Sequence, residues 1–167
     1  MEETLIQNWN SVVKSCDTVY HLGDFGFGTK EFISKTFRRL NGTKHFVVGN
    51  HDKKSKILMH DNENRTGIQS IKDYNEINVE GQQIILCHYP LLTWNRGHYG
   101  SWMLHGHCHS NLDYLNKETR RLDVGVDGVA QYFPISFEQI KEIMDKKVYK
   151  VVDHHGKSID NESVGDV

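Results

Sequence analysis

Four short apolar runs in this sequence each end in a polar cluster that can bind a metal or move a proton. Gly23-Asp24 follows VYHL, Gly49-Asn50-His51-Asp52 follows FVV, Cys87-His88-Tyr89-Pro90 follows IIL, and His105-Gly106-His107-Cys108-His109 follows WML. Short β-rich runs with such boundaries are typical of buried strands. Helical patterns also occur along the chain, and strands alternating with helices indicate an α/β fold that gathers polar groups at strand ends.

Apolar spacing predicts the remaining elements. Helices are expected over residues 2–14, 32–40 and 136–146, and strands over residues 18–22, 44–48, 68–79, 82–88, 102–104 and 122–126. Glu80-Gly81 predicts a hairpin, and Ser136 with Gln139 predicts a capping box. We expect residues 1–150 to form a single domain and residues 151–167 to form a loose C-terminal tail.

Composition narrows the class of protein. The 167 residues suffice for one domain with a core, and the formal net charge of −2 gives no indication of a stable nucleic-acid complex or of membrane-surface binding. Three cysteines without CxxC spacing argue against a disulfide framework. The absence of a long apolar run or a basic leader makes a cytoplasmic location the expectation. Eleven histidines stand out, because histidine is the commonest metal ligand.

The clusters contain five side chains that can bind a divalent cation: Asp24, Asn50, His88, His107 and His109. This set of carboxylate, amide and imidazole groups suits manganese, iron, zinc or nickel better than calcium. Taken singly, Gly-Asp is commonly a turn, a histidine at a strand end is commonly hydrogen-bonded structure, and HGHCH could be a surface zinc binder. Their shared position after strands favours one metal centre.

The order of these clusters resembles the calcineurin-like metallophosphoesterases. In that family D-x-H, GD, GNHD or GNHE, H and GHxH recur, and the GNHD and GHxH elements are the most specific. The resemblance spans residues 2 to about 145, and YHLGDFGFG, HYPLLTW and DVGVDG are similar to a small bacterial or phage branch. The resemblance implies two mixed β-sheets packed face to face and flanked by helices, an α-β-β-α sandwich.

The resemblance also implies a metal-dependent phosphoesterase. One or two divalent ions per chain would activate a hydroxide that attacks the phosphorus of a phosphomonoester or phosphodiester. Asp24 would bridge two ions, and Asn50, His88 and His107 would complete the shell of one of them. His109 would belong to the other ion.

His51 and Asp52 would then be the catalytic residues beside the metals. His51 would face the substrate and donate a proton to the leaving oxygen or a hydrogen bond to the phosphoryl group. Asp52 would accept a hydrogen bond from the His51 ring and fix its tautomer, a role compatible with capping a helix.

The first signature of the family, D-x-H, is absent from the 23 residues that precede Asp24. We therefore expect that Met1 is an internal start or a truncation, that the first strand is missing, and that sheet edges or apolar surface are exposed. Two divalent ions would share one carboxylate and leave a site charge of about +3 instead of about +2, so we expect one well-held ion and a weak or absent second. Asp153 and His155 follow the β-rich residues 148–152 and could replace the signature in a permuted fold, but we favour a chance occurrence in a polar tail.

A glycine-containing loop over residues 92–100 suggests a substrate-binding surface. Arg96 could grip a phosphate by paired hydrogen bonds, and Trp94 or Tyr99 could stack on a base. We expect Arg96 and His98 to bind a small phosphate ester, nucleotide-derived esters included; the alternative packs the loop over the core with Arg96 in solvent. The sequence leaves a homo-oligomer open.

Two other functions also remain open. A non-catalytic remnant of this fold would bind metal or phosphate without turnover. A structural zinc module would use Cys87, His88, His107 and Cys108, but neighbours on a strand face opposite ways, which makes their convergence difficult.

Overall fold

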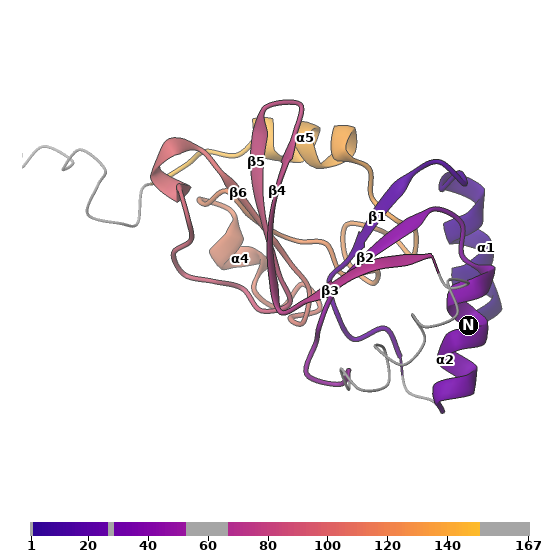
Figure 1. The fold of residues 1–167 in the computed structure, drawn as a ribbon. Helices are drawn as coiled ribbons and strands as arrows, with labels where there is room; N and C mark the ends of the chain where they lie inside the picture. The colour runs from indigo at the N-terminus through magenta and orange to yellow at the C-terminus, as the bar shows by residue number, and fades with distance from the viewer. Residues whose placement is uncertain (1, 27–28, 53–66, 151–167) are drawn as a thin grey trace, which may run out of the picture.

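The computed structural model describes residues 2–26, 29–52 and 67–150, and within them it contains two β-sheets and several helices (Figure 1). The helices are α1 (Glu2–Val12), α2 (Lys30–Arg39), α4 (Asp113–Asn116) and α5 (Phe137–Asp145), together with the 3-10 turn η2 (Gly97–Tyr99). The strands are β1 (Thr18–His21), β2 (Thr43–Val47), β3 (Ile68–Lys72), β4 (Tyr74–Val79), β5 (Gln82–Cys87), β6 (Trp102–His105) and β7 (Arg121–Asp123). None of the described helices has the length and apolar character needed to cross a membrane.

The two sheets differ in their pairing. The first sheet is parallel and has the order β1-β2-β3. The second has the order β4-β5-β6-β7, with an antiparallel β4-β5 hairpin and parallel pairing from β5 to β7. This arrangement confirms the expected mixed α/β fold with two sheets flanked by helices. Among the described strands, β1 lies at an edge of its sheet, with β2 as its neighbour.

The main core lies between the two sheets. Along β5, Ile84 and Leu86 face this core, whereas Ile85 and Cys87 face outward, as the two-residue period of a strand requires. Leu22, directly after β1, and Val47, at the end of β2, meet them, and α5 adds two further buried side chains. The buried members of this core are Leu22, Val47, Ile84, Leu86, Trp102, Leu104, Leu122, Ile140 and Met144.

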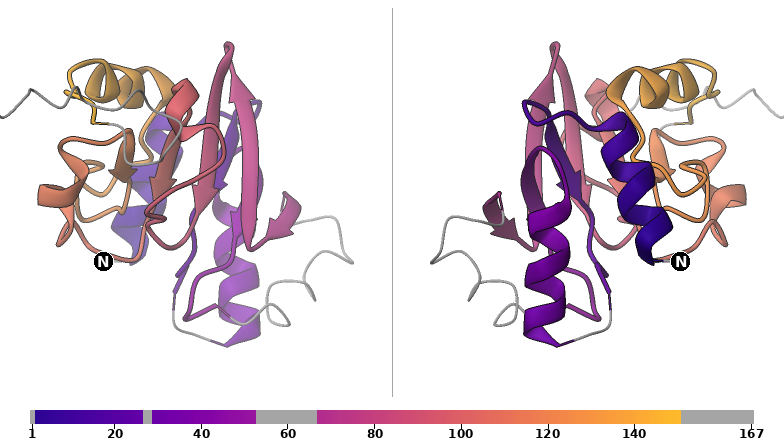
Figure 2. Two further views of the ribbon diagram at one scale, coloured as in Figure 1. Left: turned by 90° about the vertical axis from the view of Figure 1, so that its left-hand side faces the viewer. Right: turned by 90° about the vertical axis from the view of Figure 1, so that its right-hand side faces the viewer.

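Different segments cover the outer faces of the two sheets. Helices α1 and α2 lie on the same face of the first sheet (Figure 2). Ile6 of α1, Phe37 of α2 and Phe46 of β2 pack together in the core between these helices and the sheet. The outer face of the second sheet packs against Leu91 and Trp94, which belong to the segment that connects β5 to β6.

The expected strand over residues 68–79 is wrong in one respect, because it is two strands that belong to different sheets. The first strand ends before Asp73 and the second begins after it. The Lys72 ammonium donates a hydrogen bond to Asn75 Oδ1 across this junction at 2.8 Å. Aspartate is depleted in strands, and alternation alone does not show which sheet a residue joins. The hairpin at Glu80-Gly81 is confirmed, and both residues have positive φ (51° and 87°), as a type I′ turn requires.

The C-terminal part of the chain agrees with expectation up to residue 146. The Ser136–Gln139 capping box is present at the start of α5. Residues 148–150 form no strand in the described structure, and the Asp153-x-His155 motif and the rest of the expected tail lie outside the described residues.

We expect Ser136→Ala to lower the free energy of unfolding by about 1 kcal/mol, because the Ser136 hydroxyl accepts from the Gln139 N–H. Ser136→Asp keeps an oxygen at the cap and should restore most of the loss. Urea denaturation of both variants measures the difference, and equal stability of wild type and Ser136→Ala would contradict the capping role.

Candidate metal centre

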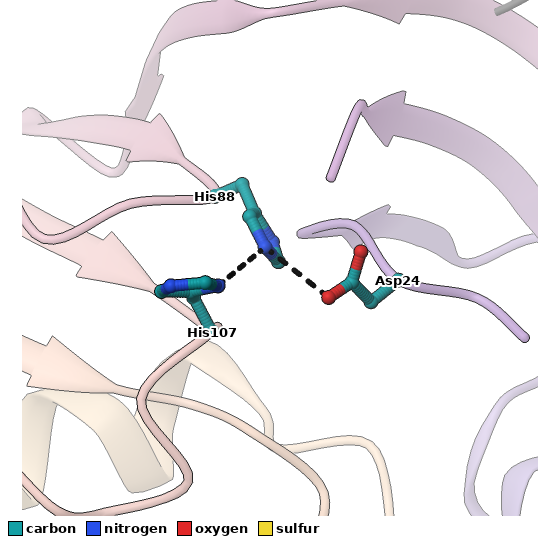
Figure 3. A group of neighbouring side chains, drawn as sticks. All are labelled: Asp24, His88 and His107. Carbon is teal, nitrogen blue, oxygen red and sulfur yellow. Dashed lines mark hydrogen bonds and ion pairs between the residues drawn. The ribbon is translucent and has the colours of Figure 1, made fainter. Parts of the chain in front are cut away.

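Four of the predicted metal ligands meet at the carboxyl ends of β1, β2, β5 and β6. His88 Nε2 lies 3.3 Å from Asp24 Oδ2, 2.9 Å from Asn50 Oδ1 and 3.2 Å from His107 Nδ1. Figure 3 shows His88 between Asp24 and His107. The ligand atoms of these three residues all lie within 4.8 Å of one another. The chain thus brings together residues that are far apart in sequence because each one follows the end of a parallel strand.

The tautomer of the neutral His88 ring is fixed by the backbone. Its side chain is 1% exposed, and its Nδ1 lies 2.8 Å from the Leu22 carbonyl oxygen. A carbonyl can only accept, so Nδ1 carries the ring proton and donates it. In the neutral imidazole, Nε2 then has a free lone pair that points toward Asp24, Asn50 and His107.

The atoms around this lone pair fit a cation. Asp24 Oδ2 and Asn50 Oδ1 are also acceptors, and His107 Nδ1 supplies at most one proton. Converging lone pairs repel one another unless positive charge lies between them. One carboxylate, one amide oxygen and two imidazoles are ligands that manganese, iron, zinc and nickel accept.

Two glycines allow the loops after β1 and β2 to cross at this point. A Cβ on Gly23 would lie 2.5 Å from His88 Nδ1 and 2.7 Å from the Gly49 Cα. A Cβ on Gly49 would overlap the Asp24 carboxylate. Gly23 also has φ +92°, which residues with side chains rarely adopt. The Gly-Asp and Gly-Asn sequences therefore reflect a close approach of two backbones.

Asp52 holds these two loops together. Its Oδ2 accepts the N–H groups of Asp24 (2.6 Å) and Gly49 (2.8 Å), and its Oδ1 accepts the N–H of Phe25 (3.1 Å). The structure thus gives Asp52 three backbone donors, and a hydrogen bond from the His51 ring to its carboxylate stays a prediction. The helix-capping alternative concerns residues beyond 52, which are outside the described part of the chain.

His51 lies at the rim of the cluster. Its backbone N–H donates to Asp24 Oδ1 at 2.9 Å, which leaves Oδ2 of that carboxylate directed at His88. The His51 side chain is exposed. Its role toward a substrate stays a prediction.

His109 is separate from the four-residue cluster. Its side chain is 70% exposed, and its Nδ1 contacts the Asp127 carboxylate, which raises the pKa of His109. The Asp24 carboxylate also raises this pKa, so the two residues are within electrostatic reach. A carboxylate on Nδ1 leaves Nε2 for a metal, a pairing found around metal-binding histidines. Asp127 is not among the residues predicted from the sequence, although it lies in the DVGVDG motif.

The structure does not bring Arg96 and His98 to the cluster. They belong to the segment before β6, and the Gly100 carbonyl in this segment accepts a hydrogen bond from the Gln82 side chain. Gln82 is the first residue of β5, whereas His88 follows the last one, so the loop and the cluster lie at opposite ends of this strand. The Arg96 charge contributes to the lowered pKa of Glu76, which lies in the middle of β4. The exposed Arg96 matches the alternative in which this loop packs on the outer face of the sheet.

The proposed zinc set does not form, because its two cysteines lie in different surroundings. Cys87 packs in an apolar cluster with Ile85 and Met103. Cys108 groups with His105 and Asp123, which sequence reasoning did not select. His105 is the last residue of β6 and Asp123 is the last residue of β7. Their position at strand ends is the sequence feature that could have identified them as candidate ligands.

His21 is a further residue of the site that is not among those predicted from the sequence. It precedes the Gly23-Asp24 turn, and its Nδ1 accepts the Gly23 N–H at 3.2 Å. Its ring stacks on Phe46 with centroids 4.9 Å apart. Burial lowers the pKa of His21 to about 4, with partial opposition from the Asp52 and Asp24 carboxylates. The neutral ring therefore supports the turn that carries Asp24.

This lowered pKa predicts a loss of stability in acid. Below pH 6.5 the unfolded chain binds a proton at His21, whereas the folded chain binds it only near pH 4. The metal-free protein should therefore lose up to about 3 kcal/mol as the pH falls from 6.5 to 4, relative to a non-titrating variant. His21→Asn keeps an acceptor for Gly23. Chemical denaturation of both proteins across this range measures the difference, and a constant difference would contradict the lowered pKa.

We expect Asp52→Asn to weaken Mn²⁺ binding by about 10- to 100-fold, because one of the two accepting oxygens is lost and the Asp24 loop is less well held. Asp145→Asn, on the exposed face of α5, makes the same charge change and should leave the affinity unaltered. Isothermal titration calorimetry measures both. Equal affinities in the two variants would remove the positioning role of Asp52.

Comparisons with known proteins agree with this geometry. A family model described as the calcineurin-like phosphoesterase superfamily domain matches residues 2–131. An uncharacterized protein of Methanocaldococcus jannaschii is 30% identical over 159 residues, which cover 91% of this chain and 80% of that protein. A crystal structure of a protein of unknown function from Aquifex aeolicus is 28% identical with a TM-score of 0.64, covering 85% of this chain and 84% of that one.

The match of the family model covers most of the chain and includes every residue of the cluster. The two-sheet architecture and the ligands at its strand ends are in keeping with it. The chain therefore belongs to the calcineurin-like phosphoesterase superfamily.

Proposed function

We propose that this chain is a metal-dependent phosphoesterase that hydrolyses a small phosphomonoester or phosphodiester. The observation that carries the proposal is the convergence of Asp24, Asn50 and His107 on the unprotonated Nε2 of His88. Membership of the superfamily gives this arrangement a chemical context.

The four converging residues would hold one divalent ion tightly. Asp24 and His109 would contribute to a second, and they are the two predicted ligands for it among the described residues. Bound cations would polarise a phosphoryl oxygen and activate the attacking water. The Leu22 carbonyl keeps His88 in the tautomer that can bind, and Asp52 keeps the Asp24 loop in place.

His51 is suited to contact the substrate. Its backbone is tied to Asp24, while its side chain is exposed beside the cluster. The ring would donate a proton to the leaving oxygen or a hydrogen bond to the phosphoryl group. Asp52 supports this residue through the loop that both share.

The surface around the cluster favours a small substrate. Asn50, His51, His107 and His109 are exposed, so a phosphate group can approach from solvent. With a formal net charge of −2 the chain offers little general attraction to a polyanion, so we propose a small ester, nucleotide-derived esters included, and no stable nucleic-acid complex.

We expect Mn²⁺- or Ni²⁺-stimulated hydrolysis of an aryl phosphodiester and an aryl phosphomonoester by the purified chain. Asp24→Ala and His88→Ala should each lower kcat/KM by more than about 100-fold, because each removes a direct ligand. Lys141→Ala, on the exposed side of α5, is the matched control and should retain full activity.

Equal hydrolysis by the wild type and both ligand variants would exclude the proposed enzyme. Tight Mn²⁺ binding without turnover of either ester would instead favour the alternative, a metal- or phosphate-binding domain without activity. The specific observation behind this alternative is that a second ion would find only Asp24 and His109 among the predicted ligands in the described residues.

A further inference from the structure

We propose that His105, Cys108 and Asp123 form a second, buried site for a thiophilic divalent cation such as Zn²⁺. One ligand atom from each residue lies within 4.8 Å of the other two. None of these residues belongs to the Asp24 cluster. The site would lie under the turn that carries His107 and His109.

His105 has the protonation of a metal-binding histidine. It is completely buried, and its Nδ1 lies 2.8 Å from the Gly106 carbonyl oxygen. Because the carbonyl must accept, the proton is on Nδ1 and the lone pair is on Nε2. The Asn116 amide nitrogen makes only a long contact with Nε2, at 3.4 Å. A cation could displace this long hydrogen bond and bind the Nε2 lone pair.

Asp123 is a buried carboxylate with neutral donors. It is 2% exposed, and its oxygens accept the N–H groups of Gly125 (2.9 Å) and Ser110 (3.1 Å). The nearby Arg121 instead directs Nε to Asn116 Oδ1 at 2.6 Å and Nη1 to the Leu91 carbonyl at 2.9 Å. The Arg121 charge reaches His105 and Cys108, but a buried carboxylate whose hydrogen bonds come from neutral groups stays costly unless a cation binds it directly.

The proton count favours a metal ion. Of the three candidate ligand groups, the Nε2 of His105 and the carboxylate of Asp123 are acceptors, and the Cys108 thiol alone carries a proton. Binding of Zn²⁺ would release this proton to solvent, and thiolate plus carboxylate would neutralise the ion. One sulfur, one imidazole nitrogen and one carboxylate oxygen are all zinc ligands, whereas magnesium and calcium prefer oxygen alone.

Such an ion would also stabilise an unusual backbone. His107, His109 and Ser110 have φ values of 67°, 49° and 61°, in the left-handed region that residues with side chains rarely occupy. Strained conformations persist where the surroundings over-determine them. An ion bound to His105, Cys108 and Asp123 would hold this turn from both ends. Any benefit of the ion to catalysis rests on the proposed function, whereas the existence of the metal site does not depend on it.

Cobalt(II) titration tests the site directly, because Co²⁺ bound to a thiolate gives an intense charge-transfer absorption. The full chain is stripped with a chelator, kept reduced, and titrated with Co²⁺. We expect a charge-transfer band that saturates as Co²⁺ is added and is lost in Cys108→Ser, whereas Co²⁺ bound at the Asp24 cluster, which has no thiolate, does not contribute to it. Cys16→Ser and Cys87→Ser should keep the band, since Cys16 is exposed and outside the proposed site, and Cys87 lies in an apolar cluster.

Two further variants keep the test independent of folding and of the first metal centre. Asp123→Asn keeps the side-chain volume and should weaken Co²⁺ binding at least tenfold, with circular dichroism confirming the fold. Asp24→Ala removes a ligand of the other centre and should leave the band intact. Absence of the band in the wild type, or its persistence in Cys108→Ser, would overturn the buried site.

The outcomes separate this inference from the proposed function. Metal-stimulated hydrolysis without the cobalt band would leave the phosphoesterase and refute the buried site. The band without hydrolysis of either ester would support the buried site and refute the phosphoesterase.

Discussion

The hydrogen bond from His88 to the Leu22 carbonyl is the interaction on which the site depends. Leu22 follows β1 in the first sheet, and His88 follows β5 in the second, so this 2.8 Å bond joins the two sheets at their carboxyl ends. It also decides which ring nitrogen keeps a lone pair. Without it, His88 could rotate or change tautomer, and the four converging residues would lose their common centre.

Much of the fold follows from local sequence patterns. The Glu80-Gly81 hairpin and the Ser136–Gln139 capping box are specified by a few neighbouring residues, and both are present. The division of residues 68–79 at Asp73 could not be derived in the same way. Whether a strand joins one sheet or the other depends on long-range pairing, and the alternation of residues is the same in both cases.

The site shows the same limit. Asp24, Asn50, His88 and His107 could be selected because each follows a strand end and carries a metal-binding group. The substrate-binding expectation for the loop over residues 92–100 rested on residue type alone, and the structure places that loop before β6, near the start of β5. The backbone contacts of Asp52 were equally hidden, because the sequence does not show that its carboxylate lies under two crossing loops.

The backbone at this site adopts conformations that lower the stability of the fold. Asp24, His107 and His109 all have positive φ values, and left-handed conformations cost about 1 kcal/mol each for residues with side chains. Glycine at these positions would relieve the strain but would remove the candidate ligand. The strain must therefore be offset by contacts nearby: Asp52 accepts the Asp24 N–H at one turn, and the buried Asp123 accepts the Ser110 N–H at the other. In both turns a carboxylate from another segment of the chain accepts a backbone N–H of the turn that presents the candidate metal ligands.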